Sequence, residues 1–238
     1  MHEQVVVNSG MKTELRKHCL ISLLLVILVG GAIIVSGIFA NSVKYPVLTT
    51  LIFFPVVGAA IIAILPRAQE ELIKFFALVV SIIEFILSVP LYISFDRATA
   101  QMQFREEALW IPQWGIKYSL GVDGISVLFI LLSSLLTILC VTVSWKEIDK
   151  KIKEFYAAVL LTHAGMIGVF MSLDIFLFYI FWEAMLIPMY LIIGVWGGPR
   201  RIYSAIKFFL YTFLGSVLML VGILVLYFHT GTSDILSL

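Results

Sequence analysis

The sequence predicts an all-α fold, a polytopic bundle of about seven transmembrane helices, from its composition and from the grouping of its apolar residues. Hydrophobic residues make up 61% of the 238 residues and charged residues 13%, whereas a soluble domain has about 45–50% and 25%. The mean hydropathy is +1.08. The apolar residues gather in runs close to the roughly 20 residues that a helix needs to cross a bilayer. A soluble globular protein is therefore excluded.

The predicted membrane helices follow one another through short connections. The apolar runs are 19–40, 47–65, 72–95, 121–145, 156–172, 174–196 and 204–228. Only Ser172, Leu173 and Asp174 separate the fifth run from the sixth. Because Ser and Asp side chains accept hydrogen bonds from the free N–H groups of a helix start, Ser172 or Asp174 is expected to cap the sixth helix. Asp123 is expected to cap the fourth helix in the same way.

Positive charge is distributed unequally between alternate connections. One set of connections carries 12 of the 16 Lys and Arg residues: Lys12, Arg16, Lys17, Arg67, Lys74, Lys146, Lys150, Lys151, Lys153, Arg200, Arg201 and Lys207. The other set carries only Lys44, Arg97, Arg105 and Lys117. Since Lys and Arg accumulate in short cytoplasmic loops, we expect a multi-pass protein of the inner (plasma) membrane with a cytoplasmic N-terminus.

The first apolar run is expected to lie outside the main domain. Residues 1–46 are predicted to form an N-terminal extension with an extra transmembrane helix or an uncleaved signal anchor, and residues 47–238 the membrane domain. The run at 19–40 is longer than the usual apolar core of about 7–15 residues in a signal peptide, and Gly37–Asn41 forms only a weak cleavage site. We therefore expect this segment to be retained.

The segment 96–120 is the one long polar connection between predicted helices. It carries the mixed charges of Arg105, Glu106 and Glu107 together with Trp110 and Trp114. Trp favours the headgroup zone, where its ring and its N–H each find a suitable medium. The segment is therefore predicted to be a solvated loop at the membrane interface.

The most informative residue is Glu183, near the middle of the apolar run 174–196. An ionisable group at mid-membrane normally faces a partner or a water-filled cavity and marks a functional site. Pro188 lacks an N–H, which frees the carbonyl of Ala184 and allows water near the carboxylate. We interpret Glu183 as a proton-carrying residue; the alternative is a structural hydrogen bond to a neighbouring helix.

Three further ionisable residues within apolar runs are candidates for the site: Lys207, His163 and Glu84. Lys207 is predicted one to two turns inside its helix, where it tunes Glu183 or conducts protons from the cytoplasm; its side chain is also long enough to reach the cytoplasmic surface. His163, which titrates near neutral pH, and Glu84 are candidate proton relays. For both residues, the alternative is a structural hydrogen bond to an adjacent helix. For Glu84, a position at an interface with another subunit is a further alternative.

Other classes of function lack a matching pattern in the sequence. The 16 basic and 15 acidic residues nearly balance, which argues against a nucleic-acid-binding protein. Cys19 and Cys140 both lie in apolar runs and form neither a disulfide framework nor a metal site. The sequence has no cluster with metal-ligand spacing and no Gly-rich phosphate loop after a strand. No cofactor is therefore expected to bind this chain.

Three stretches together resemble a known family: LTTLIFFPVVGAAIIAILPR at 48–67, GVDGIS at 121–126 and LDIFLFYIFWEAMLIPMYLIIGVWGGPRRIYSAIKFFLYTFLGS at 173–216. They are similar to the subunit M family of bacterial NADH:quinone oxidoreductase, respiratory complex I, known as chain 4 in mitochondria. The resemblance implies an antiporter-like proton channel in which Glu183 is the key intramembrane glutamate. The family also retains a lysine in the sequence context of Lys207.

The resemblance further implies the partners and the cofactors. Neighbouring membrane subunits of complex I would surround the chain in the lipid bilayer, and other subunits would hold NADH, FMN, iron–sulfur clusters and quinone. The chain ends at Leu238, before the broken helix and the second, inverted repeat of the family, so it corresponds to an N-terminal half. There are two alternatives. One is a subunit of a cation/proton antiporter or of a membrane-bound hydrogenase, and the other is a truncated structural or assembly module without transport.

Overall fold

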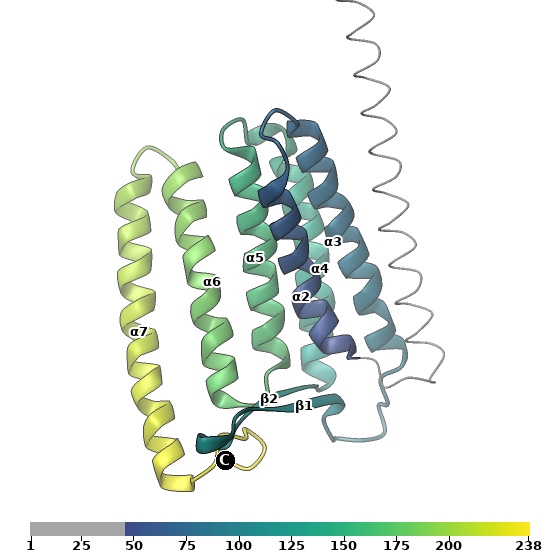
Figure 1. The fold of residues 1–238 in the computed structure, drawn as a ribbon, viewed down its shortest axis with the longest axis vertical. Helices are drawn as coiled ribbons and strands as arrows, with labels where there is room; N and C mark the ends of the chain where they lie inside the picture. The colour runs from purple at the N-terminus through teal and green to yellow at the C-terminus, as the bar shows by residue number, and fades with distance from the viewer. Residues whose placement is uncertain (1–45) are drawn as a thin grey trace, which may run out of the picture. The chain divides into compact units, whose positions relative to one another are not determined.

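The computed structural model describes residues 46–238, which form six membrane-length helices and one β-hairpin (Figure 1). The helices are α2 (Val47–Ile64), α3 (Glu70–Ile93), α4 (Gly124–Glu147), α5 (Ile152–Met171), α6 (Ile175–Trp196) and α7 (Arg201–Thr230). All six are long and apolar enough to cross a membrane. The predicted helix at 19–40 lies outside the described residues.

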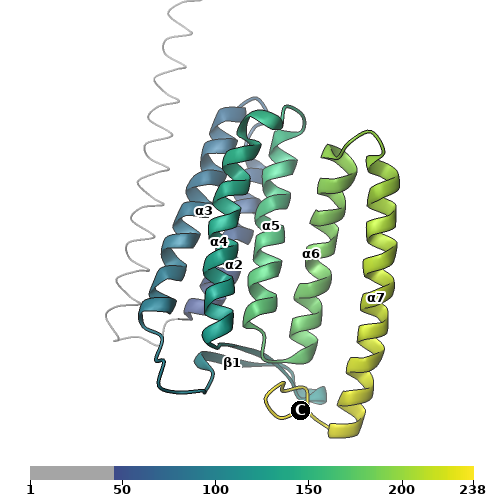
Figure 2. The ribbon, with the colours of Figure 1, turned by 180° about the vertical axis from the view of Figure 1, so that it is seen from behind.

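The helices form a group of four and a row of two. α2, α3, α4 and α5 pack against one another, α6 packs on α5, and α7 packs on α6 (Figures 1 and 2). Ala205, Ser216 and Ile223 are the buried residues of α7. The remaining side chains of α7 are partly or fully exposed and mainly apolar, as expected of a helix in contact with lipid or with further protein.

Small residues allow the helices to approach closely. A Cβ atom added at Gly58 of α2 would lie 2.9 Å from Cγ1 of Val80 in α3. In α5, a Cβ atom at Gly165 would lie 2.8 Å from Cβ of Met185, and one at Gly168 would lie 2.5 Å from the ring of Phe181. Glycine is therefore required for the present spacing of α2 with α3 and of α5 with α6.

The connection between α3 and α4 is a β-hairpin, so the prediction of a loop over 96–120 was wrong in its secondary structure. β1 (Gln103–Ile111) pairs antiparallel with β2 (Ile116–Val122). A 3₁₀ turn, Pro112–Trp114, and Gly115 in the left-handed conformation with φ 65° join the strands. The pairing shifts register twice, which breaks the strict alternation by which a strand is recognised in a sequence.

The hairpin binds the N-terminal end of α2. The carboxylate of Glu106 accepts hydrogen bonds from the backbone N–H groups of Leu48 (2.7 Å) and Thr49 (3.0 Å) and from the Thr49 hydroxyl (2.6 Å). Pro46, at the N-cap position, provides no side-chain cap. Glu106 therefore satisfies the free N–H groups of α2 from a distant part of the chain.

The hairpin also contacts the connection between α5 and α6. The N–H of Leu173 donates to the carbonyl of Ser119 in β2 (2.9 Å), and the N–H of Ile235 donates to the carbonyl of Leu173 (2.9 Å). Asp174 accepts from the N–H groups of Phe176 (3.0 Å) and Leu177, which confirms its predicted capping of this helix. The start of α6 is thus fixed between β2 and the C-terminal segment.

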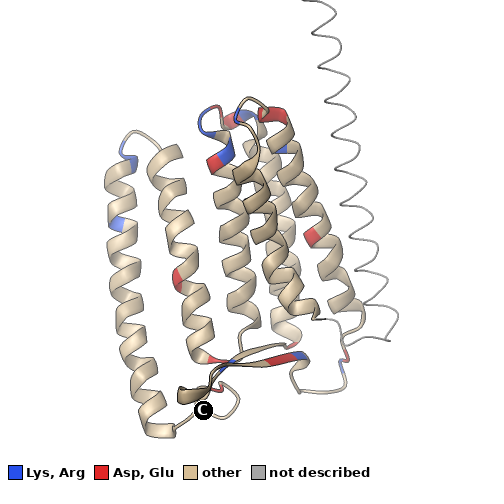
Figure 3. Ribbon diagram, in the orientation of Figure 1, with Lys and Arg blue, Asp and Glu red and all other residues tan. Residues whose placement is uncertain are grey.

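Charged residues gather at the two ends of the bundle (Figure 3). The α2–α3, α4–α5 and α6–α7 connections lie at one end and the hairpin at the other (Figure 1). Among residues 46–238, the hairpin end has three basic residues, Arg97, Arg105 and Lys117. The opposite end has nine: Arg67, Lys74, Lys146, Lys150, Lys151, Lys153, Arg200, Arg201 and Lys207.

Candidate functional site

The row of α6 side chains that faces α7 defines the first candidate site. The rings of Phe176 and Tyr227 lie 5.4 Å apart, and those of Tyr190 and Phe209 5.5 Å apart. Farther along, a Cβ atom at Gly194 would lie 3.4 Å from Cβ of Ala205. Positions spaced by three and four residues share one face of a helix. Position 183 falls on this same face, between 176 and 190.

Glu183 is half-buried at this α6–α7 interface. Its Oε1 atom is buried and has no hydrogen-bond partner among residues 46–238. Tyr179, one turn earlier, interacts with the side chains of both Glu183 and Ser216. Ser216 is one of the few buried residues of α7. A carboxylate, a phenol and a hydroxyl therefore meet near the middle of the two helices, a set of groups able to exchange protons.

Pro188 lies inside α6, which remains a continuous α-helix from Ile175 to Trp196. Proline has no N–H to offer to the carbonyl four residues earlier, here that of Ala184, the neighbour of Glu183. One backbone hydrogen bond is therefore missing within two turns of the carboxylate. The sequence predicted this weakening, and the structure shows that it does not interrupt the helix.

Lys207 is exposed and lies in the second turn of α7. It is closer than Glu183 to the end of the bundle that carries the α6–α7 connection. Its Nζ atom is 4.8 Å from the centre of the Tyr203 ring, one turn toward the helix start. Nine residues separate Lys207 from Ser216, which is roughly 13 Å along a helix axis at 1.5 Å per residue. Lys207 and Glu183 are thus placed on neighbouring helices but at different depths.

His163 is buried in α5 and contacts hydroxyl groups of α4. Its Nδ1 atom lies 3.0 Å from Oγ1 of Thr137 and 3.3 Å from Oγ of Ser133. Its Nε2 atom is buried without a partner in the described part of the chain. The predicted alternative, a hydrogen bond to an adjacent helix, therefore applies to one ring nitrogen and leaves the other available.

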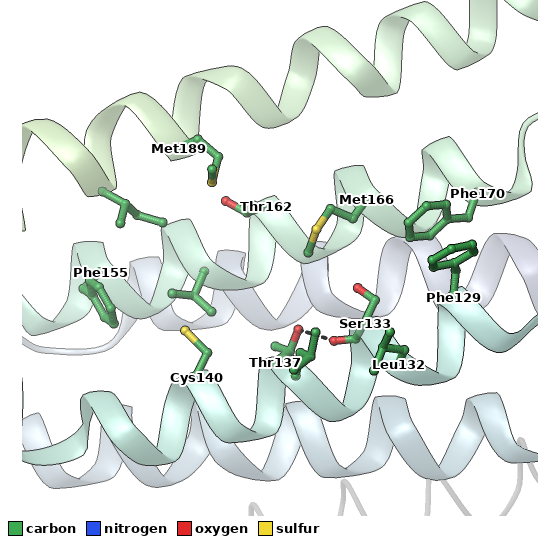
Figure 4. A pocket seen from close by; sticks show the side chains of 13 residues that line it. Phe129, Leu132, Ser133, Thr137, Cys140, Phe155, Thr162, Met166, Phe170 and Met189 are labelled. Atoms are coloured by element: carbon green, nitrogen blue, oxygen red, sulfur yellow. Dashed lines mark hydrogen bonds between the residues drawn. The ribbon is translucent and has the colours of Figure 1, made fainter. Parts of the chain in front are cut away.

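The same two hydroxyls line a cavity between α4, α5 and α6 (Figure 4). The cavity has a volume of about 390 Å³ and a mainly apolar lining that includes Phe129, Phe170 and Met189. Ser133 and Thr137 line it from α4 and Thr162 lines it from α5. His163 is not among the lining residues, but it contacts Ser133 and Thr137.

Glu84 is the most deeply buried carboxylate in residues 46–238. Its exposed fraction is 0%, and neither Oε1 nor Oε2 has a hydrogen-bond partner within this range. It lies in α3, which packs against α2, α4 and α5. The structure therefore places Glu84 in the four-helix group and Glu183 at the α6–α7 interface, two separate locations.

Acidic residues at the hairpin end act on the helix starts. Asp123 caps α4 by accepting from the N–H of Ser126 (2.7 Å), as predicted. Partial burial opposes ionisation of Asp123, but the hydrogen bonds from Ser126 and Ile125 outweigh it and lower the pKa of the carboxyl. Burial raises the pKa of Tyr118, with a smaller contribution from Glu106. No local sequence signal identified Glu106 as a cap, because its helix is 57 residues away.

Across residues 46–238, no group of three or more His, Cys, Asp or Glu side chains is arranged to hold a metal ion. Two of the ionisable side chains inside the helices lie near hydroxyl or phenol groups: His163 near Ser133 and Thr137, and Glu183 near Tyr179. Such an arrangement suits the binding and transfer of protons, which needs only groups that donate and accept hydrogen bonds.

A family model and the sequences of known proteins that match this chain describe the same group of membrane subunits. Residues 172–238 match the family model described as NADH:quinone oxidoreductase/Mrp antiporter, TM. NADH-quinone oxidoreductase subunit M of Rhodobacter capsulatus is 47% identical over 195 residues, which cover 80% of this chain and 38% of that protein. NADH-ubiquinone oxidoreductase chain 4 of Chondrus crispus is 45% identical over 182 residues, covering 76% of this chain and 37% of that protein.

A solved structure shares the fold. A chain of respiratory complex I from Thermus thermophilus with bound NADH aligns with a TM-score of 0.68 and 27% identity, over 80% of this chain and 38% of that chain. The present chain therefore spans less than two fifths of the length of these relatives. Over that shared part, it is a homologue of NADH-quinone oxidoreductase subunit M and of chain 4.

Proposed function

We propose that this chain belongs to a proton-translocating membrane subunit of NADH:quinone oxidoreductase and that Glu183 carries the proton. The observation that supports the proposal is the position of Glu183: halfway along a membrane-length helix, half-buried, with one oxygen free of partners in the described residues. The homology to subunit M supports the identity of the complex. NADH, FMN, iron–sulfur clusters and quinone are assigned to other subunits.

The proposed mechanism is electrostatic. Electron transfer in partner subunits rearranges charge in a neighbouring membrane subunit, and the new field changes the proton occupancy of Glu183. Tyr179, which interacts with both Glu183 and Ser216, would relay protons on the α7 side. Lys207, near the start of the same helix, tunes Glu183 or conducts protons from the cytoplasm.

The orientation belongs to the same proposal. The loop end, with nine of the basic residues of the described part, faces the cytoplasm, and the hairpin faces the opposite side of the plasma membrane. Protons destined for Glu183 then enter through the end that carries Lys207.

One alternative has support from the comparisons. The matching family model also describes Mrp antiporter subunits, so a cation/proton antiporter subunit is the second candidate. A purification from native membranes distinguishes the two. Copurification of NADH-oxidising, quinone-reducing subunits supports the first proposal, and copurification of antiporter subunits alone supports the second.

The central test is NADH-driven proton uptake by inverted membrane vesicles that contain the full-length subunit with Glu183→Gln. We expect proton uptake to fall to a small fraction of the parent value while the amount of assembled complex stays the same, because glutamine keeps the shape but carries no proton. Glu107→Gln, on the exposed surface of the hairpin, is the control. If an assembled Glu183→Gln complex takes up protons at the parent rate, Glu183 is a structural hydrogen-bonding residue and does not carry the proton.

A further inference from the structure

Two buried side chains in the four-helix group have polar atoms that the described chain leaves unpaired. Glu84 of α3 is 0% exposed and lacks a partner on both oxygens, and His163 of α5 is 1% exposed and lacks a partner on Nε2. Buried polar groups are almost always hydrogen-bonded to protein or to ordered water. Each of these atoms therefore needs a hydrogen-bond partner that the side chains and backbone of residues 46–238 do not supply.

The two residues lie at the same depth. α3 and α5 are parallel, because Arg67 pairs with Glu154 at 2.6 Å and so joins the short α2–α3 connection to the start of α5. A Cβ atom added at Gly58 would lie 2.9 Å from Val80 and 3.4 Å from Leu160, so these two side chains lie at one level of the bundle. Glu84 is four residues beyond Val80 and His163 three beyond Leu160, about 6 Å and 4.5 Å along the axes.

The hydrogen bonds of His163 determine what its free nitrogen needs. The Thr137 hydroxyl donates to the carbonyl of Ser133 (2.9 Å), so toward the ring it acts as an acceptor. The shorter contact, Nδ1 to Thr137, is then an N–H donated by the imidazole. In the neutral ring this leaves Nε2 as an acceptor that requires a donor. A protonated carboxyl group is such a donor.

The surroundings favour this pairing over others. α2 contributes no titratable side chain, and the titratable residues of α4 are Cys140, Lys146 and Glu147. On α3, Lys74 pairs with Glu71 at 3.2 Å near the helix start. On α5, Tyr156 has a buried hydroxyl without a partner in the described residues. No positive side chain in this part of the chain contacts Glu84.

We infer that Glu84 and His163 form a buried, water-bridged acid–base pair, a proton-binding site in the α2–α5 group that is separate from Glu183. The proton rests on the Glu84 carboxyl, which donates through water to Nε2 of His163. Transfer breaks the O–H bond of Glu84 and forms an N–H bond on Nε2, through the bridging water, and gives a carboxylate and an imidazolium. No electron transfer is involved.

Infrared spectroscopy of the full complex in membranes tests this pair without a need for transport activity. The infrared spectrum of the parent complex minus that of the Glu84→Gln complex should contain the C=O stretching band of a buried carboxylic acid. His163→Asn, which changes the acceptor, should shift that band, and so should Thr137→Val, which removes the acceptor for Nδ1. Glu107→Gln serves as the control and should leave the band unchanged.

The outcomes separate clearly. Absence of the band from the parent-minus-Glu84→Gln difference, or a band that His163→Asn leaves in place, overturns the inference. If Glu84→Gln does not assemble, Glu84→Asp keeps the acid one methylene shorter, and a moved band that still responds to His163→Asn supports the pair. Because this readout does not depend on Glu183, it fails or succeeds independently of the proposed function.

Discussion

Glu84 and Glu183 both lie near the middle of membrane-length helices, and their environments differ. Glu84 is enclosed by the four-helix group, whereas Glu183 is only half-buried and faces α7. Burial of an ionised carboxylate is strongly unfavourable without a partner. An enclosed residue is suited to storing a proton, and a partly accessible residue is suited to exchanging one.

At the scale of single residues, Glu106 provides a sharp test of the hairpin contact. Glu106→Ala removes three hydrogen bonds and leaves the N–H groups of Leu48 and Thr49 without their acceptor. We expect a loss of about 1–3 kcal/mol of stability, measured as faster loss of folded full-length subunit on heating in detergent.

The neighbouring carboxylate is the matched control for that substitution. Glu107 pairs with Arg105 at 2.7 Å, but both side chains are more than 40% exposed. An exposed ion pair contributes about 0–1 kcal/mol, so Glu107→Ala should have little effect. Equal losses for the two substitutions would contradict the assignment of Glu106 as the cap of α2.

At the scale of elements, the helices were predictable and the hairpin was not. The runs at 47–65 and 174–196 became helices with ends one residue away, because a membrane-length apolar run has few other stable structures. The strands around Trp110 lack regular alternation, and their stabilising contacts come from distant helix ends. Likewise, Glu84 and His163 were both identified from sequence, but their common depth depends on how α3 and α5 pack.

The α5–α6 contact gives a prediction at the same scale. In Gly168→Ala the new methyl would lie 2.5 Å from the Phe181 ring, so we expect a loss of about 1–3 kcal/mol from overpacking, measured by thermal unfolding of the full-length subunit. Gly215→Ala is the control. Nothing lies within 4 Å of its added Cβ, and alanine favours a helix over glycine by up to about 1 kcal/mol.

At the scale of the whole molecule, the charge asymmetry predicts accessibility. In a background without Cys19 and Cys140, a cysteine at Lys150 should react with a membrane-impermeant maleimide in inverted vesicles, and one at Thr99 should react only in vesicles of native orientation. Lys150 is exposed and Thr99 is half-buried. They belong to the α4–α5 and α3–β1 connections, which lie at opposite ends of the bundle (Figure 1). The reverse labelling pattern would place the basic loops outside the cell.

The attachments of α6 determine how this helix can deform. Its start is fixed by Asp174 and β2. Its other end is fixed by Trp196, whose Nε1–H donates to the carbonyl of Lys150 at 2.6 Å and whose ring contacts Phe155. A helix that is held at both ends is displaced most near its middle when it bends. Glu183 and Pro188 bracket the midpoint of α6, where a backbone hydrogen bond is already missing. A push from a neighbouring subunit would therefore bow the helix sideways and displace the carboxylate farther than any other part.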